Sequence, residues 1–221
     1  MKGRHVRILW DSIETVLLDM DGTLLDRHFE DFFWDELVPR RYATKHRLPL
    51  AAAKEKLKTI YQSKLNTVYW GDIAYWEKRL DLRLWGLRYQ TQHLVRMHPH
   101  TMRFLKFLKQ RKKKVYLVTA ALRADVDFKL STNAIGCYFD GIFSEFEIGA
   151  SKKSVVFWEK LQRLIGFKKN STMVADDEAS VLKAAKKYGI KWIVLKKTFS
   201  SKKEPRASDE FISVRHFDDI L

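Results

Sequence analysis

The stretch TVLLDMDGTLLD, residues 15–26, places two carboxylates directly after a hydrophobic segment. Asp19 ends the apolar run, Asp21 follows two residues later, and Gly22 and Thr23 come next. Carboxylates at the edge of a core are costly to bury unless a cation compensates them. One Asp can attack phosphorus and form an aspartyl-phosphate, while a second carboxyl group protonates the leaving oxygen and then activates water. This spacing therefore suggests phosphoryl transfer.

The rest of the chain predicts the scaffold that such a site needs. Short, apolar, mostly β-branched segments at 114–119, 141–144, 171–176 and 191–195 predict strands that follow a first strand ending at Asp19. Helical patterns at 153–166 and 178–189 end at Gly166 and Gly189, and the first of them is expected to bury Val156, Leu161, Leu164 and Ile165. Alternating strands and helices predict a doubly wound, Rossmann-like α/β fold with a parallel sheet.

Polar residues at the ends of these strands should meet at one edge of the sheet, where open α/β folds bind ligands. Besides Asp19 and Asp21, this set contains Thr119, Lys152, Asp176 and Asp177. Four carboxylates need a cation, and a set of oxygen ligands without a thiolate or His cluster favours Mg²⁺. A metal, a lysine and a threonine side by side suit the oxygens of a phosphoryl group, and Gly22 allows the backbone to approach it closely.

The connection from the first to the second strand is far longer than a crossover requires. Most of it is helical in pattern, so residues 28–98 are expected to form a helical cap domain inserted into an α/β core of residues 1–27 and 99–221. Pro39 is expected to end the first of these helices, and Asp72 to cap a later one. The expected core of this domain includes the aromatic residues Trp70, Tyr75, Trp76 and Trp85, and one of its helical patterns consists of Leu57, Ile60, Tyr61 and Leu65.

The DMDGT stretch, Thr119, Lys152 and the Asp pair at 176–177, in this order, resemble the four motifs of the haloacid dehalogenase-like (HAD) hydrolase superfamily. The resemblance spans essentially the whole chain and includes the helical cap. It implies that Asp19 is the nucleophile, that Asp21 is the acid/base and lends its backbone carbonyl to the metal, and that Lys152 stabilises phosphate and nucleophile. It also implies that the substrate phosphate contacts Gly22, Thr23, Thr119, Ala120 and Lys152, and that the Mg²⁺ ligands are Asp19, Asp21, Asp176 and Asp177, the last two binding directly or through water.

The segments at 10–26, 32–42 and 75–80 further resemble bacterial purine 5'-nucleotidases that act on GMP and IMP, which implies a nucleoside monophosphate as substrate. Thr119-Ala120-Ala121 departs from the Thr-Asn-Ala that this group usually has, and Lys153 is an alternative to Lys152. A phosphoglycolate-type phosphatase and a phosphomutase stay open as alternatives. A dehalogenase is disfavoured because it does not need Asp21 as an acid/base.

Charge and composition limit which binding partners and which cellular compartment are expected for the chain. The 221 residues carry 42 Lys and Arg against 27 Asp and Glu, a net charge of +15 that would attract phosphates or nucleic acid. A nucleic-acid-binding protein or a polynucleotide-end phosphatase is the less favoured interpretation, because the basic residues are dispersed and not interleaved with aromatic ones.

The sequence contains neither a membrane-length apolar run nor a secretory signal, and the single Cys137, expected to be buried, fits a reducing cytoplasm. The oligomeric state is left open.

Overall fold

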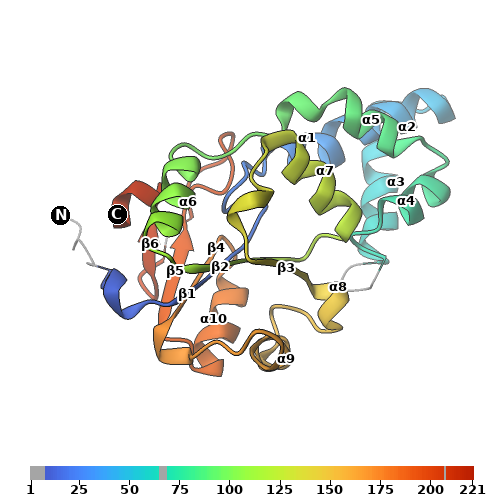
Figure 1. Ribbon diagram of the computed structural model, residues 1–221. Coiled ribbons are helices and arrows are strands. Elements are labelled where there is room, and N and C mark those ends of the chain that lie inside the picture. Colours follow the sequence, from blue (N-terminus) through green and yellow to red (C-terminus); the bar gives the residue numbers. More distant parts are fainter. Residues whose placement is uncertain (1–7, 65–68, 207) are drawn as a thin grey trace. The chain divides into compact units, whose positions relative to one another are not determined.

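The structure is a computed structural model that describes residues 8–64, 69–206 and 208–221 (Figure 1). The chain divides into two compact units. The larger consists of Met1–Asp26 together with Arg96–Leu221, and the smaller of Arg27–Val95. Leu65, part of one expected helical pattern, lies outside the described residues.

The larger unit is built on a parallel sheet whose strand order is β3-β2-β1-β4-β5-β6. The strands are β1 (Thr15–Leu18), β2 (Lys114–Thr119), β3 (Gly141–Ser144), β4 (Thr172–Asp176), β5 (Trp192–Lys196) and β6 (Ile212–Val214). The expected doubly wound α/β fold is confirmed, and each predicted strand lies within one residue of its observed bounds. The edge strand β6 was not predicted, because three residues are too few to show a period.

Helices cover both faces of this sheet, with α6 and α7 on one face and α9 and α10 on the other (Figure 1). The α-helices are α6 (Thr101–Gln110), α7 (Arg123–Asn133), α8 (Glu145–Ile148), α9 (Val155–Ile165) and α10 (Ala179–Tyr188). Short 3₁₀ turns occupy Trp10–Ser12, Gly136–Tyr138, Lys169–Ser171 and Phe217–Ile220. Because β1 pairs with β2 on one side and β4 on the other, the strand order reverses beside β1. Ligands of doubly wound folds bind at such a reversal.

The buried face of α9 differs in part from the expected one, because Leu161 is buried and Ile165 packs against the core as expected but the other two residues do not. Phe157, Trp158 and Leu161 are buried against the sheet, whereas Val156 and Leu164 are 48% and 63% exposed. The two aromatic side chains remove more apolar surface from water than Val156 and Leu164 would, which fixes the rotation of the helix. The stop at Gly166 is observed, because this residue takes the left-handed conformation at the helix end.

The smaller unit consists of helices packed around an aromatic core. Its elements are α1 (His28–Phe32), a π-helical turn (Phe33–Leu37), α2 (Val38–His46), α3 (Leu50–Gln62), α4 (Ile73–Leu80), α5 (Leu84–Gln90) and a 3₁₀ turn (Gln92–Leu94). Asp72 caps α4 as expected, since its side chain accepts the Tyr75 N–H at 3.1 Å. Trp76 is fully buried, and Tyr75 and Trp85 pack against the core, but Trp70 is 48% exposed and not a core residue.

Pro39 does not end the first helix of this unit, contrary to expectation. The helix passes through a π-helical turn, in which the Val38 N–H donates to the carbonyl of Phe33, five residues back, and then continues as α2. Proline lacks an N–H group and its ring crowds the carbonyl four residues back. The wider turn just before Pro39 lets the helix pass this residue.

One further expectation from composition needs correction. Cys137 is exposed, because it lies in a 3₁₀ turn ahead of β3 and not in a core element. Not all of the basic residues are exposed to solvent: the Lys196 ammonium group is buried and donates to the carbonyl oxygens of Thr198 and Arg215. None of the helices in the described ranges combines the length and apolar character needed to cross a bilayer.

Candidate active site

The candidate site lies at the carboxyl ends of the strands in the larger unit, where the strand order reverses. Asp19 directly follows β1, and its N–H donates to the Ala175 carbonyl of β4 at 3.0 Å. Thr119 ends β2 and Asp176 ends β4, followed by Asp177. The parallel pairing of β1 with β2 and β4 places these side chains at one edge of the sheet, as the sequence predicted.

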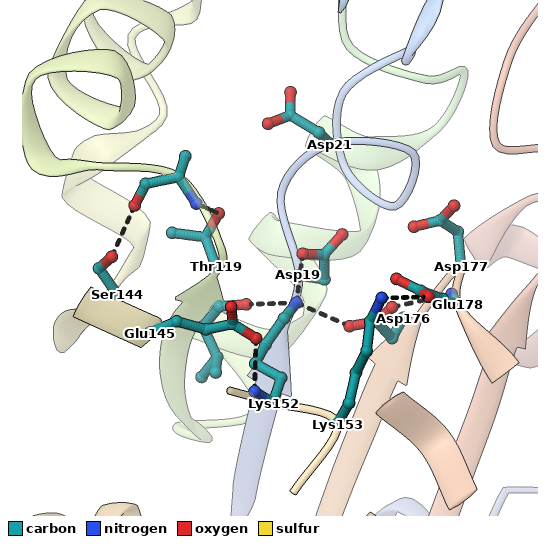
Figure 2. A network of polar contacts seen from close by, with 12 residues as sticks. Asp19, Asp21, Thr119, Ser144, Glu145, Lys152, Lys153, Asp176, Asp177 and Glu178 are labelled. Carbon is teal, nitrogen blue, oxygen red and sulfur yellow. Dashed lines mark hydrogen bonds and ion pairs between the residues drawn. The ribbon is translucent and has the colours of Figure 1, made fainter. Parts of the chain in front are cut away.

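Lys152 connects two of the carboxylates (Figure 2). Its Nζ lies 2.6 Å from Asp19 Oδ1 and 2.9 Å from Asp176 Oδ2, and the side chain is 4% exposed. The Glu145 carboxylate accepts a hydrogen bond from the backbone N–H of Lys152, and the Trp158 indole N–H donates to the backbone carbonyl of Lys152 at 2.9 Å. The backbone of this lysine is thus fixed on both sides. Lys153, the alternative, pairs instead with Glu178 at 2.8 Å.

Burial and the charge of the partner group shift the pKa values of Asp19 and Lys152 in opposite directions. Burial raises the pKa of Asp19, the Lys152 ammonium lowers it and the Asp176 carboxylate raises it, and together they bring this pKa to about 6. For Lys152, burial alone would lower the pKa, but the carboxylates of Asp176 and Asp19 raise it well above its usual value. The proton therefore stays on the lysine at neutral pH, and Asp19 is mainly ionised, as a nucleophile must be.

The loop after β1 is tightly folded around Gly22. This residue has a φ of +93°, and a Cβ atom there would lie 2.7 Å from the Asp177 carboxyl carbon. Glycine is required at this position both for the conformation and for the close approach. Thr23 next to it is fully buried, and its Oγ1 has no hydrogen-bond partner among the described residues.

The side chain of Asp21 points away from Lys152 and the other carboxylates (Figure 2). It is 24% exposed, and its Oδ2 lies 2.7 Å from the Nζ of Lys129 in α7. The sequence places Asp21 in the constellation but contains no signal that singles out Lys129 among 42 basic residues. The contact arises only because α7 packs beside the β1 loop.

Thr119 and its neighbours form the end of β2. Thr119 is 2% exposed and its hydroxyl accepts the Ala121 N–H at 3.1 Å, so the turn folds back over this side chain. Ser144, at the end of β3, donates to the Ala121 carbonyl at 2.6 Å and ties the turn to the next strand. Ala120 is exposed between these anchored residues.

Asp19, Asp176 and Asp177 meet the geometric requirement for a metal site. Each offers a carboxylate oxygen, and these oxygens lie within 4.8 Å of one another. Asp19 Oδ2 is buried and has no hydrogen-bond partner in the described part of the chain, an arrangement that costs free energy unless a ligand satisfies it. An all-oxygen set of this kind fits a hard cation such as Mg²⁺. The Asp21 carboxylate lies outside this group of three.

Arg206 also contacts the site and was not expected from the sequence. Its Nη1 lies 2.8 Å from Asp177 Oδ2 and also donates to the Asp177 carbonyl oxygen. The guanidinium group packs over the ring of Phe199, at 4.1 Å from the ring centroid. The segment after β5 therefore carries a residue that fixes Asp177.

The fold and the order of these residues agree with the comparison to known families. The family model of the haloacid dehalogenase-like hydrolases matches residues 13–189 of the chain. The chain therefore belongs to the haloacid dehalogenase-like hydrolase family, and within it to the phosphatase enzymes.

The chain is similar to individual proteins of this family and to solved structures. The chain is 30% identical over 188 residues to the GMP/IMP nucleotidase YrfG of Escherichia coli, with 85% of each protein covered. A HAD phosphatase from Thermococcus onnurineus has a similar structure, with a TM-score of 0.74 and 21% identity over 92% of this chain and 94% of that one. An L-2-haloacid dehalogenase, PA0810, superposes with a TM-score of 0.63 and 14% identity over 94% and 97% of the chains. The fold alone thus accommodates both phosphatases and dehalogenases, and the site residues must discriminate.

Proposed function

We propose that the chain is a Mg²⁺-dependent phosphomonoesterase that works through an aspartyl-phosphate and hydrolyses purine nucleoside 5'-monophosphates such as GMP and IMP. The observation that carries this proposal is the position of Asp19, a mainly ionised carboxylate beside Lys152 and two further acids at the strand reversal. The nucleotidase relative supplies the substrate class.

The residues that would hold the metal are Asp19, Asp176 and Asp177 through their carboxylates, and Asp21 through its backbone carbonyl. Mg²⁺ supplies positive charge that offsets the negative oxygens of the phosphoryl group. Lys152 adds a second positive charge next to Asp19, at 2.6 Å from its Oδ1. In a site shielded from water, such charges stabilise the transition state more strongly than they would in solvent.

Asp19 attacks phosphorus, and its oxygen forms a new P–O bond while the bond to the leaving oxygen breaks. The protonated form of Asp21 donates its proton to that oxygen and becomes a carboxylate. In the second step the Asp21 carboxylate takes a proton from water, the water oxygen bonds to phosphorus, and the bond to Asp19 breaks. Thr119, Thr23 and the backbone N–H group of Ala120 donate hydrogen bonds to the phosphoryl oxygens. The Gly22 N–H donates instead to the Leu25 carbonyl at 2.7 Å, so Gly22 serves the site through the close approach of its backbone.

In this proposal, Ala120 makes up for the absence of an asparagine in the second motif through its backbone. Only an N–H group is needed at that position to bind a phosphoryl oxygen, and Ala120 retains it. The helical residues 28–98 correspond to the cap domain that the sequence predicts, and a cap that closes during catalysis excludes water from the reaction and favours a small substrate. The single cysteine favours a cytoplasmic location for this reaction.

A panel of phosphomonoesters tests the substrate class. GMP, IMP, AMP, phosphoglycolate and a hexose phosphate are compared by phosphate release in Mg²⁺. We expect the highest kcat/KM for GMP or IMP. A clear preference for phosphoglycolate would favour the alternative phosphatase, and isomerisation of the sugar phosphate without phosphate release would favour a mutase.

Removal of the metal tests the proposed cofactor. In excess EDTA, hydrolysis should stop, because Asp19, Asp176 and Asp177 then repel the phosphate dianion. Added Mg²⁺ should restore the rate, whereas the far-ultraviolet circular dichroism spectrum should stay the same throughout. Undiminished turnover in the chelator would rule out the metal-dependent scheme.

A further inference from the structure

Lys129 is a buried ammonium group whose partners come from two different parts of the larger unit. Its side chain is 1% exposed, and Nζ lies 2.7 Å from Asp21 Oδ2 and 2.8 Å from Asp125 Oδ2. Asp125 is one turn earlier on the same helix, α7, whereas Asp21 lies 108 residues away in the β1 loop. A buried ammonium group needs such partners, since an unpaired one would cost several kcal/mol.

One carboxylate is enough to neutralise this lysine. Asp125 is in the favourable position for an i, i+4 pair with its acid on the N-terminal side, and its side chain is only 10% exposed. The second contact, to Asp21, is therefore not needed to neutralise the Lys129 charge, because Asp125 already does so within α7. Its effect is to fix one oxygen of a carboxyl group that is otherwise partly exposed, at 24%.

We propose that Lys129 is a positioning residue for Asp21, the acid/base of the proposed reaction, on which this inference rests. By donating to Oδ2, the buried ammonium group holds the carboxyl group in one orientation. Asp21 can then meet first the leaving oxygen and later the attacking water. Proton transfer is sensitive to such placement, because the acid must be within hydrogen-bond reach of the atom that it protonates. Lys129 itself exchanges no proton and forms no covalent bond.

The test uses two substrates that differ in their need for an acid. The alkoxide leaving group of a nucleotide such as GMP is strongly basic and must be protonated, whereas the phenolate of p-nitrophenyl phosphate leaves without that help. Lys129→Met should lower kcat/KM for the nucleotide by about 100-fold, and that for the aryl phosphate by about tenfold or less. A purely structural role would lower both values by the same factor.

Two further variants serve as controls. Asp125→Asn removes the other partner of the lysine but leaves the contact to Asp21, so the ratio of the two kcat/KM values should stay within about threefold of wild type. Lys129→Arg keeps the charge and shifts the donor atoms. It should change the ratio in the same direction as Lys129→Met but by less, and this prediction can be tested even if the methionine variant does not fold.

A double-mutant cycle completes the experiment. In an Asp21→Asn background, Lys129→Met should change neither kcat/KM value much further, because the group that it positions is gone. Equal losses on both substrates, or losses that add in the double variant, would overturn the positioning role. If the wild-type enzyme hydrolyses neither ester, the proposed function itself fails, which is a different result.

Discussion

At the scale of single residues, the site depends on a few charged side chains whose neighbours fix both position and protonation. Asp19 is the clearest case. It is buried with Lys152 at 2.6 Å, and its second oxygen has no partner among the described residues. A buried carboxylate kept in this state is typical of a group that reacts or binds a ligand.

Replacing the proposed nucleophile gives a direct test. Asp19→Asn should reduce turnover by roughly three orders of magnitude or more, because an amide cannot form the acyl-phosphate. The fold should persist, since the substitution changes one oxygen into an NH₂ group. Asp11→Asn, at a side chain that is 95% exposed, is the control and should keep full activity. Asp19→Asn turnover within tenfold of wild type would contradict the assignment.

His98 provides a second prediction, about stability. Its side chain is buried, its Nε2 has no hydrogen-bond partner in the described ranges, and burial, helped by the positive Lys196, lowers its pKa to about 4. Between pH 6.5, the usual value, and pH 4, the unfolded chain binds a proton at His98 that the native protein does not. The free energy of unfolding should therefore fall as pH decreases through this window, by at most about 3 kcal/mol from this residue.

Urea unfolding of the EDTA-treated protein at several pH values measures this effect. Other groups titrate in the same range, so the informative quantity is the difference between wild type and His98→Leu. That difference should shrink or reverse as the pH falls from 6.5 to 4. Parallel stability curves for the two proteins would show that His98 does not carry this dependence.

At the scale of elements, strand positions and helix stops at glycine follow from the sequence more readily than the rotation of helices, whereas the stop expected at Pro39 did not hold. The bounds of β2 and β3 match the predicted ones to the residue, because a short apolar, β-rich run between turn residues marks a strand through local composition alone. The buried face of α9 depends instead on which side chains the sheet accommodates. Val156, Leu164 and Phe157 are all apolar, and the sequence alone does not rank them.

This rotation can be tested with a matched pair of substitutions in α9. Phe157→Ala removes a fully buried ring and should lower the free energy of unfolding by about 3–5 kcal/mol. Leu164→Ala, at a side chain 63% exposed, should change it by about 0.5 kcal/mol or less. Both are measured by urea unfolding under identical conditions. Similar losses for the two variants would contradict the observed helix face.

The site shows the same division between what is local and what depends on the tertiary fold. Asp19, Thr119, Lys152, Asp176 and Asp177 could be found from the sequence because each ends a predicted strand, directly follows one or lies on a connecting loop after one. Lys129 and Arg206 could not, because their contacts to Asp21 and Asp177 arise from the packing of α7 and of the segment after β5. Nothing in their local sequence differs from that of other basic residues.

At the scale of the whole molecule, the net charge of +15 calls for an explanation that the site alone does not give. Some of the basic residues have structural partners. Lys196 is buried against carbonyl oxygens, Arg206 pairs with Asp177, and Lys183 lies 3.4 Å from Glu210. Many others are exposed, and their field would raise the local concentration of any phosphorylated partner.

Salt dependence separates a mononucleotide from a polymer as the partner of this charge. A nucleic acid would be bound through several phosphates together, so its affinity should fall by about 0.7 to 0.9 log units per phosphate contact for each tenfold rise in salt. A mononucleotide carries one phosphate, so kcat/KM should depend only weakly on salt. We expect the weak dependence, together with good hydrolysis of GMP or IMP and poor release of phosphate from oligonucleotide ends. Efficient release from an oligonucleotide end, with GMP and IMP left intact and a steep salt dependence, would instead identify the positive surface as a nucleic-acid-binding surface.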